Sequence, residues 1–175
     1  MTIPANSFFK SYKQLNKDID ALSLSLEKRH AKHINCKKGC DLCCMAISVF
    51  PVEFHAIKTE LEKSEMTILP KPKDSSRCRF LVDHSCTMYE HRPVICRTHG
   101  LPLVYMSMDT DEYELSLCEL NFTEFDFEEF DEENTFPLDK INSRLYQINK
   151  QFVAGFEGGR YTEQDRISLS DLMGE

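Results

Sequence analysis

The sequence predicts a mainly α-helical chain with a small β-hairpin, in which amphipathic helices flank a compact, irregular, cysteine-rich centre. Apolar residues recur at helical spacing near both ends of the chain, eight cysteines are concentrated between residues 36 and 118, and one short segment has the pattern of a hairpin. At 175 residues the chain has the length of one domain, 1–175, and can bury about two-thirds of its unfolded surface.

The N-terminal segment 1–33 contains a regular apolar stripe. Its members follow one another at steps of three or four residues: Phe8, Tyr12, Leu15, Ile19, Leu22 and Leu26. This spacing predicts an amphipathic helix from about Ser7 to His30, with Asn6 or Ser7 as its N-cap. His30 and His33 lie at its C-terminal end, where the helix dipole favours them.

A second helix is predicted to begin at Pro51, a favourable first helical residue, with Phe54, Ile57 and Leu61 on its inner face. The stretch LPKPKDSSR, residues 69–77, reads as an irregular connector, and Pro93 is expected to start a short helical turn.

The second half contains a predicted hairpin and a predicted final helix. YMSM and YELSL flank DTDE, which is typical of a small β-hairpin. The C-terminal helix is expected over 137–155, because apolar residues again recur at steps of three and four: Leu138, Ile141, Leu145, Ile148 and Phe152.

The charge distribution argues against nucleic acid as a partner. Residues 1–100 carry 16 Lys and Arg against 11 Asp and Glu, a net of +5, and residues 101–175 carry 5 against 18, a net of −13, which together give the overall −8. A chain of this sign repels phosphate backbones. No secretory signal and no membrane-spanning run are visible, so we expect a cytoplasmic protein.

The cysteines admit three interpretations. They are Cys36, Cys40, Cys43, Cys44, Cys78, Cys86, Cys96 and Cys118. Four disulfides fit the even count, but a reducing cytosol disfavours them, and adjacent Cys43 and Cys44 cannot pair without severe strain. Buried small hydrophobic residues are a second interpretation, although CKKGCDLCC does not resemble a core segment. The spacing favours the third interpretation, metal ligation within a core 36–118.

The first cysteine cluster has a spacing that suits a soft or borderline cation. Cys36, Cys40 and Cys43 form C-x3-C-x2-C, which brings thiolates together at a small loop-closure cost, and Gly39 supplies backbone freedom. If the backbone is extended at the doublet, Cys43 and Cys44 point to opposite sides and serve either two ligand sets or one site and its surroundings. Zinc sites and a [4Fe–4S] cluster both fit, and eight cysteines suffice for two zinc sites.

Three cysteine segments lie between about residues 36 and 122: CKKGCDLCC, CRFLVDHSCTMYEHRPVICRTHGLPL and CELNF. Together they resemble the bacterial YkgJ-like cysteine-cluster family, described as a zinc- or iron-chelating domain. The segments contain a Cys-Cys doublet, Cys-x-Phe-Leu and Cys-x-x-Tyr segments, and an Arg-Pro-x-x-Cys-Arg box. Arg79 and Met88 depart from the family's usual Pro and Ile, and the first gap has three residues, but no departure removes a thiol.

The resemblance implies a bacterial protein of undefined cellular role in which all eight cysteines bind zinc or iron. The alternative is an enzyme whose metal or iron–sulfur centre supports redox chemistry or protein modification, because flagellin lysine methylases carry a similar cluster. No cofactor-binding βαβ unit is visible, and Leu42 stands where radical-SAM cluster motifs normally have an aromatic residue.

Three further features have a functional and a structural interpretation each. His99, three residues after Cys96, is either a ligand or proton carrier, or a hydrogen-bonded neighbour of the site. Arg92 and Arg97 either lower thiolate pKa values or form structural salt bridges. The acidic region 109–133 either docks a basic protein partner or is a solvated face whose phenylalanines point inward.

Overall fold

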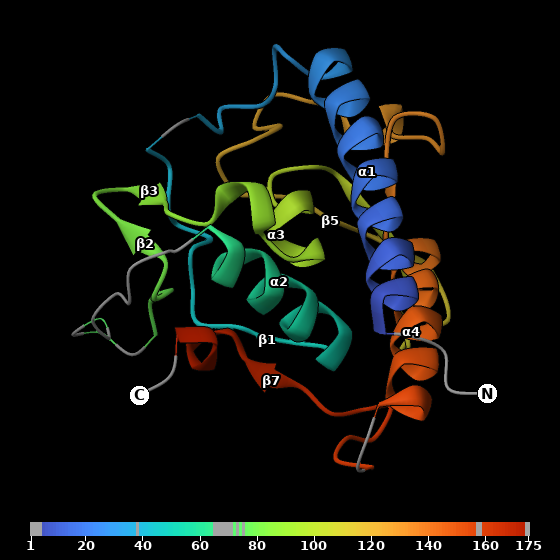
Figure 1. Ribbon diagram of the computed structural model, residues 1–175. Coiled ribbons are helices and arrows are strands. Elements are labelled where there is room, and N and C mark those ends of the chain that lie inside the picture. The colour runs from blue at the N-terminus through green and yellow to red at the C-terminus, as the bar shows by residue number, and fades with distance from the viewer. Residues whose placement is uncertain are drawn as a thin grey trace. The chain divides into compact units, whose positions relative to one another are not determined.

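The computed structural model describes residues 5–37, 39–64, 72, 74, 76–156 and 159–173. Its helices are α1 (Ala5–Arg29), α2 (Pro51–Lys63), α3 (Val94–Thr98) and α4 (Leu138–Gly155), with 3-10 turns η1 (Tyr89–His91), η2 (Phe127–Glu129) and η3 (Leu169–Met173) (Figure 1). Its strands are β1 (Ser48–Val49), β2 (Leu81–Val82), β3 (Ser85–Cys86), β4 (Leu103–Met106), β5 (Tyr113–Ser116), β6 (Phe136–Pro137) and β7 (Ile167–Ser168). The fold is therefore helical with small sheets. Most of the connector predicted at 69–77 lies outside the described residues.

The predicted helices are confirmed, with small shifts at their ends. Five of the six residues of the apolar stripe on α1 are buried, and only Leu22 is half-buried. The N-cap prediction was wrong, because α1 begins at Ala5 and so includes Asn6 and Ser7. Terminal residues of helices are the least determined by periodicity, since a stripe fixes the face of a helix better than its first residue.

The chain divides into two compact units, which are described separately. The first unit comprises Met1–Gln14, Lys38–Pro93 and Tyr146–Glu175. The second unit comprises Leu15–Lys37 and Val94–Leu145. Helices α1 and α4 each contribute residues to both units, and the sequence prediction of one domain stays a prediction.

The first unit has a core cluster beneath α2. Its buried members are Val49, Phe54, Ile57, Leu61, Phe80, Met88, Leu169 and Leu172, and Cys78 and Cys86 pack against it. The two-stranded pair β1–β7 brings the C-terminal segment onto this core, with Val49 opposite Ile167 (Figure 1). Neither this pairing nor the β2–β3 hairpin was predicted from the sequence. In that hairpin Asp83 and His84 both have positive φ, as a two-residue type I′ turn requires.

The second unit contains a three-stranded sheet of order β5-β4-β6. The antiparallel β4–β5 pair is the hairpin that the sequence predicts, whereas the parallel pairing of β4 with β6 was not predicted. The acidic region keeps some of its aromatic residues inside: Phe122 is buried, but Phe127 is 66% exposed. His30 is buried against Phe122, and its Nε2 donates a 2.7 Å hydrogen bond to the carbonyl of Asn134, so its imidazole belongs to the core of the unit.

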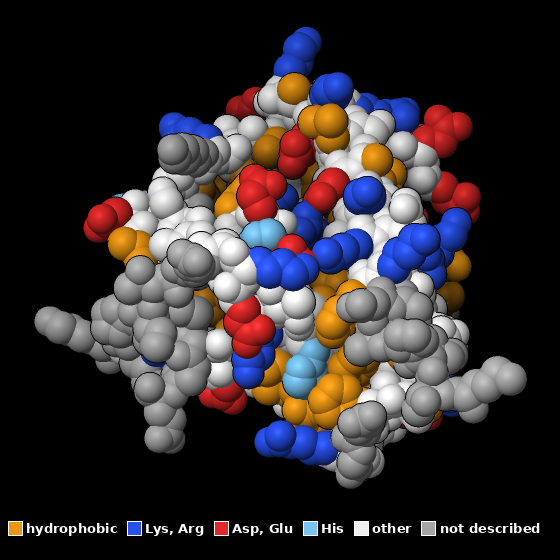
Figure 2. Space-filling model, in the orientation of Figure 1, with side chains coloured by type: hydrophobic (Ala, Val, Ile, Leu, Met, Phe, Trp, Pro, Cys, Tyr) orange, Lys and Arg blue, Asp and Glu red, His pale blue; other side chains and the backbone are white. Residues whose placement is uncertain are grey.

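Charge on the molecular surface is mixed in sign. Figure 2 shows Lys and Arg side chains interspersed with Asp and Glu side chains on the face in view. Among the helices that the structure describes, none is both long and apolar enough to span a membrane.

Candidate metal centre

All eight cysteines lie in the described part of the chain, and all are thiols, so the disulfide interpretation does not describe this structure. Five of them belong to the first unit: Cys40, Cys43, Cys44, Cys78 and Cys86. The other three, Cys36, Cys96 and Cys118, belong to the second unit. Cys36 and Cys43 are exposed and the others are half-buried.

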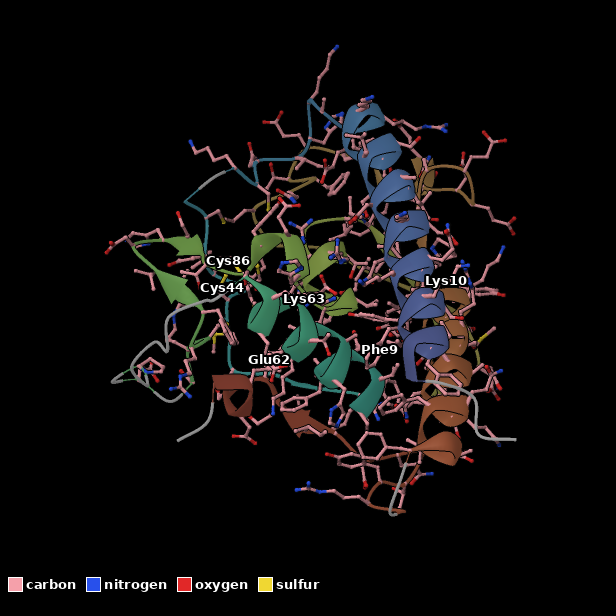
Figure 3. The ribbon with its side chains drawn as sticks, viewed as in Figure 1. Phe9, Lys10, Cys44, Glu62, Lys63 and Cys86 are labelled. Atoms are coloured by element: carbon pink, nitrogen blue, oxygen red, sulfur yellow. The ribbon has the colours of Figure 1, made fainter. Side chains whose placement is uncertain are left out.

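In the first unit, three chain segments bring Cys44, Cys78 and Cys86 together. The N–H of Cys78 donates to the carbonyl of Cys44 at 3.1 Å, and Met45 forms an antiparallel bridge with Arg77. Cys86 lies opposite Leu81 in the β2–β3 hairpin, immediately beyond Cys78. Figure 3 shows Cys44 and Cys86 close to each other at the base of this hairpin.

The neighbouring cysteines affect the pKa of Cys44. The pKa of Cys44 is raised to about 12. Burial is the largest cause, and Cys43, Cys78 and Cys86 add to it because neighbouring thiolates repel one another. The nearby carboxylate of Asp41 acts in the same direction. Three other thiols are therefore close enough to Cys44 to influence its ionisation.

Backbone N–H groups already point at two of these sulfurs. Burial raises the pKa of Cys78, but the N–H groups of Phe80 and Leu81 donate to its sulfur and partly offset this effect. Burial likewise raises the pKa of Cys86, and the N–H of Met88 donates to its sulfur. Such hydrogen bonds favour thiolate over thiol, as a sulfur that binds a cation requires.

Asp41 links the cysteine loop to the hairpin. Its Oδ2 accepts hydrogen bonds from His84 Nδ1 and from the Arg77 guanidinium, both at 2.9 Å. These bonds, that from His84 first, lower the pKa of Asp41, so its carboxylate stays charged. No role was predicted for Asp41 or Arg77 from the sequence. The position of Asp41 inside CKKGCDLCC was the signal that could have identified it.

In the second unit the three thiols lie on three separate segments. Cys36 follows α1, Cys96 is carried by α3, and Cys118 follows β5. Asn121 donates from Nδ2 to Cys36 Sγ at 3.5 Å. No role was predicted for Asn121 from the sequence, although this residue lies in CELNF, three residues after Cys118.

For Arg97 the structure supports the structural interpretation. Its guanidinium donates to both carboxylate oxygens of Asp20, at 2.8 and 2.7 Å, and this pair ties α3 to α1. Arg92 lies 3.8 Å from the centre of the Tyr89 ring and also lowers the pKa of Cys86 electrostatically, although burial keeps that pKa raised overall.

His99 is exposed as a residue, yet the protein around its imidazole desolvates the charged form and lowers its pKa. A neutral imidazole is the form that binds metal ions. The side chain of His84 is 74% exposed and is bonded to Asp41 rather than to a cysteine.

The donor set fits a zinc or iron centre in its chemistry. Thiolates are the ligands that both metals accept, and clustered thiols with N–H donors aimed at their sulfurs match this requirement. Among the residues that the structure describes, no three His, Cys, Asp or Glu side chains are already arranged as a closed metal site. The eight predicted ligands are therefore brought into two units but not into a finished coordination sphere.

Comparisons with known proteins agree with the resemblance seen in the sequence. The CxxCxxCC family, whose description is "Putative zinc- or iron-chelating domain", matches residues 35–125. Searches of curated proteins and of solved structures found no match. The matched range covers more than half of the chain and contains all eight cysteines. The chain belongs to the CxxCxxCC family, to which zinc or iron chelation is ascribed.

Proposed function

We propose that this protein binds zinc or iron through thiolates, with a first site in the first unit formed by Cys44, Cys78 and Cys86. Cys43 or Cys40, from the same cysteine loop, supplies the fourth ligand. A cation bound there would hold the three chain segments together and stabilise the charged form of each sulfur. We also place the protein in the cytoplasm, because a reducing compartment keeps clustered cysteines available as metal ligands.

One geometric observation carries this proposal. The Cys78 N–H donates to the Cys44 carbonyl at 3.1 Å, and the β2–β3 hairpin that follows carries Cys86, so three chain segments bring their thiols to one place. Crowded thiols resist ionisation because each new thiolate repels the others. A bound cation reverses this penalty, since it attracts all of the thiolates at once. Crowding that is unfavourable in the metal-free protein is thus the arrangement that a chelating site needs.

The surroundings of the site support the same function. Cys78 and Cys86 rest on the apolar core, which excludes water from one side of the sulfurs. The N–H donors from Phe80 and Met88 orient these sulfurs, as residues around metal ligands commonly do. Arg77 reduces the negative charge around Cys78.

Metal analysis of the full chain, purified without oxygen, tests the proposal. We expect zinc or iron bound in stoichiometric amount, with the visible absorption of an iron–sulfur cluster if iron is present in that form. Cys86→Ser should remove the metal of this site. Ser85→Ala, which changes the exposed neighbouring residue on the same strand, should keep it.

Two results would contradict the proposal. One is wild-type protein that takes up neither metal after reduction and anaerobic reconstitution. The other is Cys86→Ser protein that retains the full wild-type metal content, because no thiolate site built on Cys86 could survive that change.

A further inference from the structure

Although Cys36 is an exposed residue, its sulfur packs closely against the backbone of Gly100 in the second unit. Gly100 has a φ of +91°, and a Cβ placed on it would lie 3.0 Å from Cys36 Sγ and 3.3 Å from Asn121 Nδ2. Carbon and sulfur cannot approach that closely without displacement. The absence of a side chain at Gly100 therefore gives the Cys36 sulfur its place against the backbone.

Asn121 fixes the same sulfur from the other side. Its side chain is buried, with the residue 3% exposed, and its Nδ2 donates to the carbonyl of Gly100 at 2.7 Å and to Cys36 Sγ at 3.5 Å. Its Oδ1 accepts the N–H of Asn35 at 2.8 Å. Both ends of one amide thus hold the segment that carries Cys36.

The two other cysteines of this unit lie on the segments that form this frame. Cys96 is four residues before Gly100, and Cys118 is three residues before Asn121. The N–H of Asn121 also donates to the carbonyl of Cys118 at 2.9 Å. The frame therefore joins the segments of Cys36, Cys96 and Cys118 through Gly100 and Asn121.

We propose that the second unit holds a separate cation site, with Cys36, Cys96 and Cys118 as thiolate ligands and Asn121 as the residue that positions Cys36. This inference rests on the proposed function, since both sites take a cation that prefers thiolates, zinc or iron. His99 is the candidate for the fourth ligand, because it lies between α3, which carries Cys96, and Gly100, which contacts Cys36. The protein then binds two cations, one in each unit.

The role of Asn121 follows from the chemistry of its donor. An amide N–H that donates to a thiolate stabilises the negative sulfur, and groups of this kind typically change metal affinity by about 10–100-fold when they are replaced. A carboxylate at the same position would place a negative charge beside Cys36 and remove the donor. Asn121→Asp should therefore weaken the second site and leave the first one unchanged.

Counting cations per chain separates the two proposals. The full chain is purified without oxygen, its zinc and iron are measured, and the chelator-treated protein is titrated with Co²⁺ while the sulfur-to-cobalt absorption is followed. We expect two cations in the wild type, one in Cys86→Ser, one in Cys118→Ser and none in the double variant. A wild type that binds one cation, or a single variant that loses both, overturns the second site but leaves thiolate chelation standing. A wild type that binds none overturns both.

A pair of asparagine variants gives a second test that does not depend on removing a cysteine. Asn134 is also buried in the second unit, at 6% exposed, and its Nδ2 donates to the carbonyl of Glu129 at 2.8 Å. We expect Asn121→Asp to lower the affinity for one of the two Co²⁺ ions by about tenfold or more and to alter its absorption. Asn134→Asp should change neither. Equal effects of the two substitutions would show that Asn121 serves only the fold, and would overturn its assignment.

Discussion

Replacing Asp20 by Ala should destabilise the protein more than replacing its partner Arg97 by Met. The two side chains are buried to different extents, 8% exposed for Arg97 and 48% for Asp20. Asp20→Ala removes the anion beside a buried cation, a change that costs about 3–5 kcal/mol in fully buried pairs. Arg97→Met keeps the aliphatic stem and leaves a carboxylate that water can reach, so we expect a loss of about 1–2 kcal/mol.

Two effects reduce the cost of Asp20→Ala. Ala is a better helix former than Asp by about 0.5 kcal/mol, and Asp20 lies inside α1. The exposure of Asp20 also weakens the pair through solvent screening. We therefore expect a net loss of about 2–4 kcal/mol for Asp20→Ala. At about 2–4 °C per kcal/mol for a chain of this length, the melting temperature should fall by roughly 10 °C.

Thermal unfolding followed by circular dichroism, in excess chelator and again with excess zinc, measures these losses. Asp18→Ala is the matched control, because Asp18 accepts a 2.6 Å hydrogen bond from Arg144 in a pair whose side chains are 39% and 43% exposed. This surface pair should contribute less than about 1 kcal/mol. If Arg97→Met is as destabilising as Asp20→Ala, or if Asp18→Ala matches Asp20→Ala, the reasoning from unequal burial is refuted.

Three further predictions concern single residues. In the metal-free protein, Cys44 should react with iodoacetamide at pH 8 at least about a hundredfold more slowly than glutathione, because the pKa of Cys44 is raised to about 12. Mass spectrometry of the peptide that contains Cys44 gives the rate. A rate close to that of glutathione would contradict the raised pKa. Between pH 9.0, the ordinary pKa of the thiol, and about pH 12, Cys44 keeps its proton in the folded protein and loses it in the unfolded chain. The metal-free protein should therefore lose stability as pH rises through this interval. Glu60→Gln should lower stability at pH 7 by at most about 1 kcal/mol, because hydrogen bonds from two lysines at the surface hold the pKa of Glu60 at about 2, below its ordinary 4.5. This stabilisation is lost as pH falls from 4.5 toward 2. Unfolding curves with equal acid dependence in the variant and the wild type would argue against it. Gly39→Ala and Gly100→Ala both strain a backbone with positive φ, at a cost of about 1 kcal/mol, but only the Cβ at Gly100 would meet Cys36 Sγ. In urea unfolding, Gly100→Ala should therefore lose about 1–3 kcal/mol more than Gly39→Ala. Equal losses would exclude the close approach of Cys36 Sγ to Gly100.

The sequence predicted the elements whose signal is local. A stripe at steps of three and four specifies α1 and α4, and Pro51 begins α2 as its fixed φ favours. The β4–β5 hairpin was also predicted, because its strands are joined by a short polar segment. The pairs β1–β7 and β4–β6 were not predicted, since two-residue strands carry no alternation and their partners lie far apart in the sequence.

The site follows the same division between local and distant information. The cysteine spacing, together with the family resemblance, indicated chelation and named eight candidate ligands. It did not show that Cys44 lies with Cys78 and Cys86, because a bridge between Met45 and Arg77 and the backbone of the hairpin bring these segments together. It also gave no reason to associate Cys36 with Gly100, whose contact depends on the folded path of the chain.

The tail of the protein completes the support beneath the first group of thiols. Leu169 and Leu172 belong to the same core cluster as Phe80, and Arg79 donates to the carbonyl of Ser170 at 2.9 Å. The family match ends at residue 125, so a fragment trimmed to that boundary would keep all eight cysteines and lose these apolar contacts. Phe80 would then be exposed to water on one side. Such a fragment should aggregate and should no longer hold Cys78 and Cys86 in position. The apolar support of Cys78 and Cys86 therefore extends well past Cys118, the last cysteine of the chain.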